Sequence, residues 1–286
     1  MNNKNETTCS AWYLRIAPIL VLLAAASAMV LLSVRTVDSP DIGYHLGYGE
    51  KLVETGWPMD TSDYIYTIEP EMELGPGEWR DETGTFRFVN VNWLSQGLFY
   101  AAWKAGGWVG LSLLTAILVA AITGLLIRFL LRCGVTPIYV AAVLLLAAIT
   151  STSRFELRPE LLTYLLLACL LNLLRPFYMD RDAHLSSKTV FGVLLLQVLL
   201  VNSHSFFLLG WILTGVLLGG AIVRWIFAAA QQQDTALARR QTAGFSGLLG
   251  GQLAVSFLNP WTWRAVVMPF EMLWFFHKNP LVSNSQ

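Results

Sequence analysis

The sequence predicts an all-α integral membrane protein with about seven transmembrane helices and a large first outer loop. Hydrophobic residues make up 55% of the 286 residues and charged residues only 13%, and the mean hydropathy is +0.53. A water-soluble chain of this length needs a more polar surface than this composition supplies. Seven apolar runs, with one acidic loop between the first two, give the predicted order of elements.

The first apolar run extends from Ile16 to Val34, after a polar segment of residues 1–15. A helix needs about 20 apolar residues to cross the hydrocarbon of a bilayer. The run is longer than the apolar region of about 7–15 residues that a secretory signal peptide contains. We therefore expect an uncleaved transmembrane helix over residues 16–34.

Six further apolar runs predict a transmembrane helix bundle over residues 107–258. They are residues 109–131, 135–149, 161–178, 190–201, 206–223 and 245–258. The short connectors on one side of these runs carry most of the bases, which is typical of cytoplasmic loops. This predicts a multi-pass protein with residues 1–15 in the cytoplasm, and with residues 35–106 and 259–286 on the outer face.

The outer loop, residues 35–106, contains twelve of the nineteen carboxylates and only four bases before Trp93. Residues 43–55 have the spacing of an amphipathic helix that Gly56 and Pro58 end. A second amphipathic helix, rich in aromatic residues, is predicted from Val91 to Trp103, as suits a lipid interface. Residues 69–84, rich in Glu, Pro and Gly, predict a mobile excursion.

Two classes of site are disfavoured by the sequence. The bases are spread over short connectors, whereas a nucleic-acid partner requires a concentrated basic surface. The cysteines, Cys9, Cys133 and Cys169, are odd in number and widely spaced, so we expect neither a disulfide framework nor a cysteine metal site.

The candidate catalytic residues, Asp41 and Asp38, lie where the first apolar run gives way to the acidic loop. His45 follows Asp41 by four residues and would share a helix face with it. A carboxylate beside an imidazole can abstract a proton, hold a divalent metal or orient the counter-ion of a phosphate. The alternative is structural, because Asp38 or Ser39 can cap a helix that the turn at Pro40 opens, with Asp41 in its first turn.

Three further candidates lie in later outer loops. Arg154 and Arg158 could bind a phosphate, and His204 could bind a substrate or transfer a proton. The alternatives are again structural. Arg158 could reach the interface while Glu160 stabilises the start of a helix, and His204 could bond backbone groups at a helix end.

Several segments occur in an order that resembles a known family. They are Asp41-Ile-Gly-Tyr-His45-Leu, Glu50 to Pro58, Asp63 to Thr67, Asn92 to Gln96, Arg154 to Glu160, Asn202-Ser-His204 and Asn259-Pro260. Together they resemble bacterial polytopic membrane proteins related to the type C glycosyltransferases, the mannosyltransferase-like group that uses polyprenyl-phosphate sugars. The resemblance extends from Asp38 to Pro280.

The resemblance implies a bacterial inner-membrane hexosyltransferase that acts on the outer face. Its donor would be a lipid-phosphate-linked sugar, and its acceptor a lipid, a glycan or a protein. The family's catalytic base or metal-associated carboxylate falls on Asp41, with Asp38 as the next candidate. Arg154 and Arg158 would bind the leaving phosphate, and His45 and His204 the substrate. No cofactor is fixed, although a divalent metal is compatible with this role.

The chain departs from the family in two ways. Gly43-Tyr44 stands where an aromatic doublet is frequent, and relatives usually continue through further spans. We therefore expect a truncated product or a reduced member of the family. A non-catalytic relative that binds lipid-linked sugar within an assembly, flippase or polymerase complex is the alternative function.

Overall fold

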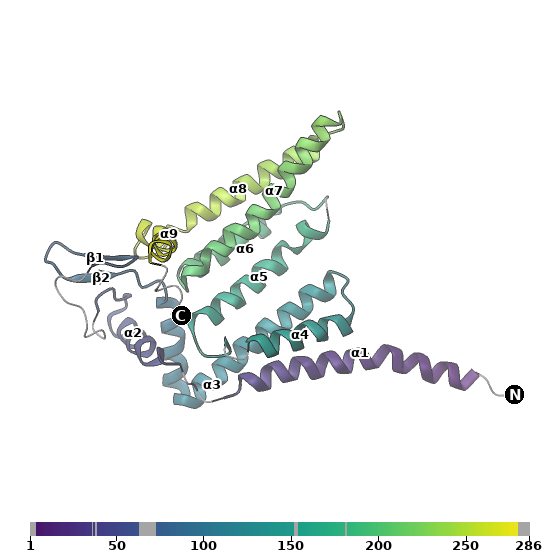
Figure 1. Ribbon diagram of the computed structural model, residues 1–286, viewed down its shortest axis with the longest axis horizontal. Coiled ribbons are helices and arrows are strands. Elements are labelled where there is room, and N and C mark those ends of the chain that lie inside the picture. The colour runs from purple at the N-terminus through teal and green to yellow at the C-terminus, as the bar shows by residue number, and fades with distance from the viewer. Residues whose placement is uncertain are drawn as a thin grey trace.

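The computed structural model describes residues 4–35, 37, 39–62, 73–151, 154–180 and 182–279, with side chains from residue 16 onward. Within these ranges the chain is mainly helical, with one short two-stranded hairpin (Figure 1). The helices are α1 (Lys4–Ser33), α2 (Ile42–Thr55), α3 (Trp93–Arg132), α4 (Pro137–Ser151), α5 (Pro159–Met179), α6 (Ser187–Val201), the short 3-10 helix η2 (Ser205–Phe207), α7 (Leu208–Ala230), α8 (Ala236–Val255) and α9 (Trp263–Lys278).

The prediction of an all-α membrane protein is confirmed. Four stretches are long and apolar enough to cross a bilayer: Ile16–Ser33 of α1, α3, α5, and the stretch that η2 and α7 form together. Helices α4 and α6 are apolar but shorter, and α8 is less hydrophobic along its length. Each of the seven predicted runs thus coincides with a helix, whereas the count of seven spans is not confirmed by length and composition.

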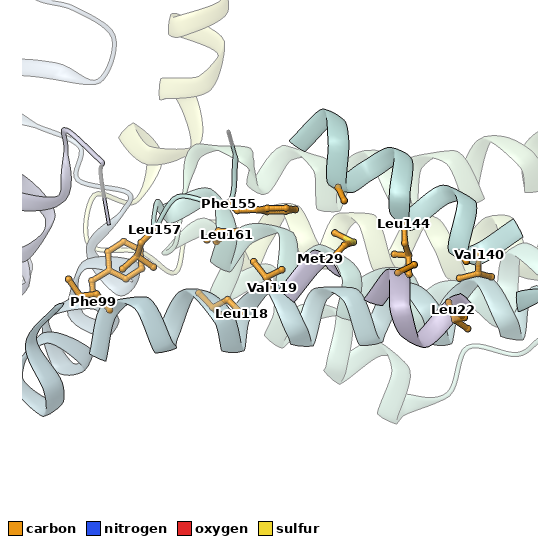
Figure 2. Close-up of a cluster of buried hydrophobic side chains, with 14 of the residues drawn as sticks. Leu22, Met29, Phe99, Leu118, Val119, Val140, Leu144, Phe155, Leu157 and Leu161 are labelled. Carbon is orange, nitrogen blue, oxygen red and sulfur yellow. The ribbon is translucent and has the colours of Figure 1, made fainter. Parts of the chain in front are cut away.

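The helices pack as two units that share α5. The first unit joins α1, α3 and α4 to the start of α5, and Figure 2 shows its buried side chains, among them Met29, Leu118 and Leu144. The second unit packs α6, α7 and α8 around the rest of α5, where Leu170 and Leu174 are fully buried. Because α5 contributes to both units, it joins the two into one bundle.

A buried polar network connects α6, α7 and α8 within the second unit. The Gln252 side chain donates to Gln197 Oε1 (3.2 Å) and to the carbonyl of Gly210 (3.2 Å). Gln197 in turn donates to Ser256 Oγ (3.1 Å), which also accepts from the Trp211 indole (3.2 Å). A side chain at Gly210 would collide with the Gln197 amide and displace it from this network.

Both segments predicted as amphipathic helices, residues 43–55 and 91–103, are helical for nearly all of their length. α2 ends at Gly56, whose φ of 70° is left-handed and favours glycine. α3 contains the second amphipathic helix and a membrane-type helix, separated by a kink at Gly106 and Gly107, where φ and ψ leave the helical region. The first part of α3 runs across the bundle and the second part along it (Figure 1).

The prediction of a mobile excursion over residues 69–84 is corrected by the structure, in which residues 78–88 form an ordered hairpin. Strands β1 (Glu78–Arg80) and β2 (Phe86–Phe88) form an antiparallel hairpin. At its turn, Asp81 accepts hydrogen bonds from the backbone N–H groups of Thr83 and Thr85, both at 3.0 Å. The Arg87 guanidinium then ties Asp81 (3.0 Å) to Asp60 (2.6 Å). Residues 63–72 lie outside the described ranges.

Helix α9 crosses the end of the bundle that carries the hairpin. It contacts residues 77–91, which we call the loop segment. Its Ala265 and Met268 pack with Val89 and Val91 in a third buried cluster, which also includes Trp261. We call the end of the bundle that carries α2, the hairpin and α9 the loop end. Figure 1 shows that α2, the hairpin and α9 all gather there.

Candidate functional site

Asp41 precedes α2 at the loop end, and its carboxylate does not cap that helix. The residue occupies the N-cap position, yet its side chain makes no capping hydrogen bond. The residue is exposed, and its backbone carbonyl accepts a hydrogen bond from the N–H of His45 (3.0 Å). The helical spacing therefore places His45 one turn beyond a carboxylate that is not used for capping.

His45 is buried at the contact between α2 and α3, with 5% of its surface exposed. Its Nδ1 lies 3.5 Å from Gln96 Nε2, and an amide nitrogen can only donate, so Nδ1 accepts. Asn90 orients the Gln96 amide through a 2.8 Å bond to Gln96 Oε1. The His45 ring also meets the ring of Phe99 edge-on, with centroids 6.0 Å apart.

Burial lowers the pKa of His45 to about 4, while the charges of Asp41 and Glu160 act in the opposite direction. At neutral pH the imidazole is therefore uncharged, and its Nε2 carries the proton. A ring in this state donates a hydrogen bond and is a weak base. Of the predicted pair, His45 is suited to orient a ligand through its Nε2–H, whereas Asp41 offers an exposed carboxylate that caps nothing.

His204 faces Glu160 across the start of α5. Its Nδ1 accepts a hydrogen bond from the backbone N–H of Phe206 (3.3 Å), which leaves the proton on Nε2. That Nε2 lies 3.9 Å from Glu160 Oε1. Burial lowers the pKa of His204, and the Glu160 carboxylate opposes the shift. The imidazole is thus a neutral donor that points at a carboxylate.

Arg158 belongs to the same group, because its positive charge contributes to the lowered pKa of His45. Its Nε and Nη2 atoms lie 3.2 Å and 3.1 Å from Glu156 Oε2. Arg35 approaches the other oxygen of Glu156 at 3.7 Å. Two guanidinium groups therefore share the Glu156 carboxylate, and at His45 the charges of Asp41 and Glu160 act more strongly than that of Arg158. We call Asp41, His45, Arg158, Glu160 and His204 the loop-end cluster.

Arg154 lies apart from these contacts, at the edge of a different feature. It borders a cavity of about 310 Å³ whose other lining residues are mainly apolar and include Met29, Phe155 and Tyr164. The cavity lies between α1, α3, α4 and α5. It could accept a hydrocarbon chain while Arg154 holds an anionic group at its rim.

The structure thus groups three of the predicted residues with Asp41, namely His45, Arg158 and His204. Asp38 lies outside the described residues. The sequence indicates Glu160 only as a helix-start residue and gives no signal for Glu156 or Gln96, because their positions near the histidines depend on how α2, α3 and α5 pack. In the described part of the chain, no three His, Cys, Asp or Glu side chains are grouped closely enough to hold a metal ion.

Comparisons with protein-family models, curated proteins and solved structures found no match to this chain. The resemblance to the type C glycosyltransferases therefore rests on the order of short sequence segments alone.

Proposed function

We propose that the chain is a glycosyltransferase-like protein of the bacterial inner membrane. In this proposal seven helices cross the bilayer, the N-terminus is cytoplasmic and the loop end faces outward. The protein would move a hexose from a polyprenyl-phosphate carrier to an acceptor hydroxyl at the outer surface. The sugar and the acceptor class, whether lipid, glycan or protein, stay open.

The observation that supports this most is the chemistry of the loop-end cluster. An exposed carboxylate that caps nothing lies one helical turn from a neutral imidazole, near a second pair formed by Glu160 and His204. The cluster lies at one end of a bundle that includes membrane-length apolar helices. A lipid-linked head group at the membrane surface would reach this position.

The proposed reaction uses Asp41 as the base. The acceptor oxygen forms a bond to the anomeric carbon of the sugar while the bond between that carbon and the phosphate oxygen breaks. The acceptor proton passes to Asp41, and the carrier phosphate leaves with the electron pair of the broken bond. Arg158 would balance the phosphate charge, and the Nε2–H of His45 would hold a sugar or phosphate oxygen.

A second candidate function is binding of the lipid-linked sugar without turnover. The cavity bordered by Arg154 favours it, because Arg154 is the only charged side chain among the described residues that line it. A polyprenyl chain in this cavity, with its phosphate on Arg154, would be held without any reaction. The two candidates make different predictions for Asp41.

The first prediction concerns Asp41→Asn. The purified full chain is reconstituted in liposomes with polyprenyl-phosphate mannose, and release of free mannose is measured, with water standing in for the unidentified acceptor. We expect the variant to lose at least about 100-fold in rate, since a positioned general base contributes about 10²–10⁴-fold. Glu54→Gln, which changes an exposed carboxylate at the far end of α2, is the matched control and should keep the wild-type rate.

Binding of the same donor is measured in parallel by native mass spectrometry. Donor binding with no release by the wild-type protein, and loss of binding in Arg154→Gln, would favour the binding function. Release by Asp41→Asn at the wild-type rate would refute the assignment of Asp41. Neither binding nor release for any polyprenyl-phosphate hexose would refute both candidates.

A further inference from the structure

Helix α9 has an apolar stripe that the rest of the described chain leaves exposed. Trp263, Val267, Phe270 and Trp274 recur at intervals of three and four residues and so lie on one face of the helix. Their exposed fractions are 53%, 37%, 50% and 60%. Large aromatic side chains in such a row are costly to leave in water, so the row indicates a covering surface.

The stripe faces away from the loop segment. Ala265 and Met268, on the opposite side of the helix, are buried against Val89 and Val91. The attachment is specific, because the Gly77 N–H donates to Glu271 Oε2 (2.8 Å) and Met268 packs directly on Gly77. In Figure 1 α9 is seen end-on, with the hairpin on the side away from the bundle. The stripe therefore points away from the hairpin.

The orientation and the charges of α9 fit the surface layer of a bilayer. The helix runs across the direction of the long apolar helices, next to the end of α8 (Figure 1). Arg264 lies over the rings of Trp79 (4.4 Å) and Trp263 (4.9 Å), and Lys278 over Trp274 (4.8 Å). Cations beside an aromatic stripe match the headgroup layer, where amphipathic rings and basic side chains meet phosphates.

We infer that α9 lies in the plane of the membrane, with Trp263, Phe270 and Trp274 in the leaflet at the loop end. Arg264 and Lys278 then face lipid phosphates. The other side of the helix packs on the loop segment. The position of α9 in the bilayer therefore fixes the distance of the hairpin from the membrane surface. This inference does not depend on the proposed enzymatic activity, because a protein that only binds donor would be anchored in the same way.

The experiment places a spin label on the stripe. Phe270→Cys is made in the full chain after Cys9, Cys133 and Cys169 are replaced by serine, and the labelled protein is reconstituted in phosphatidylethanolamine and phosphatidylglycerol liposomes. Collisions with oxygen, which concentrates in hydrocarbon, are compared with collisions with a water-soluble nickel chelate. Glu82→Cys, at the exposed turn of the hairpin, is the matched control, and Val267→Cys repeats the test on the same stripe.

We expect oxygen to dominate at residues 267 and 270, and the nickel chelate to dominate at residue 82. Equal access of the chelate to residues 270 and 82 would overturn the inference. Protection of residue 270 accompanied by spin–spin broadening that disappears on dilution with unlabelled protein would also overturn it, because a second copy of the chain would then cover the stripe. An unchanged unfolding midpoint in each variant, relative to the serine-substituted parent, verifies the fold.

Discussion

Asp41 illustrates what single residues revealed in advance and what they did not. Its spacing from His45 predicted that both would lie in the first turns of one helix, whereas the structure places Asp41 at the N-cap, directly before α2. The Asp41 side chain makes no capping bond, and Asp38, the carboxylate predicted as a possible cap, lies outside the described residues. Glu160, whose charge also acts on His45, lies 119 residues after Asp41 in the chain. Only tertiary packing brings it near His45.

The buried His45 should make the protein sensitive to acid. Its pKa is lowered to about 4 from the ordinary 6.5, so between these values the unfolded chain binds a proton that the folded chain excludes. The free energy of unfolding should therefore be constant above about pH 6.5 and fall as the pH drops toward 4. At about 1.4 kcal/mol per pKa unit, the loss is roughly 3 kcal/mol.

His45→Gln should flatten this dependence when unfolding is followed in detergent by tryptophan fluorescence from pH 7 to pH 4. Part of the pH dependence will persist in this variant, because burial also lowers the pKa of His204. His184→Gln, which changes an exposed histidine in the connector before α6, is the matched control and should keep the wild-type slope. The same slope in His45→Gln would show that His45 does not cause the acid sensitivity.

At the scale of elements, the sequence predicted helices better than strands. Apolar periodicity indicated α2 and both parts of α3, and two adjacent glycines mark the boundary between those parts. The hairpin was missed because its strands are three residues long and include charged side chains. Its stability depends on Asp81 and Arg87 acting together with the distant Asp60, which local pattern does not reveal.

The kink in α3 gives a prediction about Gly107. Its φ of 53° and ψ of −137° suit glycine, whereas a residue with a Cβ is strained there. Gly107→Ala should lower the free energy of unfolding by about 1–3 kcal/mol, measured by thermal unfolding in detergent. Gly124→Ala, in the regular part of α3 with open space around it, should be neutral or slightly stabilising. Equal effects of the two changes would contradict a requirement for glycine at the kink.

At the scale of the whole molecule, composition alone predicted the class of protein correctly. It could not establish how many helices cross the bilayer, because α4 and α6 are short and α8 mixes polar with apolar residues. Such helices gain stability from neighbours as much as from lipid, so hydropathy separates them poorly from buried helices.

The proposed seven-span topology places the hairpin and the connector between α7 and α8 on opposite sides of the membrane. Glu82→Cys and Gln233→Cys, in chains whose own cysteines are replaced by serine, should therefore differ in labelling by a membrane-impermeant maleimide. In bacterial spheroplasts we expect label on residue 82 at once, and on residue 233 only after permeabilisation. Labelling of both residues from the same side would require an even number of crossings between them.

The division of the bundle into two packing units has a consequence for any ligand of the loop-end cluster. Asp41 and His45 lie at the start of α2, which packs on α3, whereas His204 lies between α6 and η2. Hydrogen bonds from Trp93 and Ser95 of α3 to Asn202 and Ser203 already link the two regions. A molecule that contacts Asp41 and His204 together would further link these two regions. Because it would bind only the folded protein, it would raise the free energy of unfolding. Thermal stabilisation can thus screen for substrates before any reaction is known.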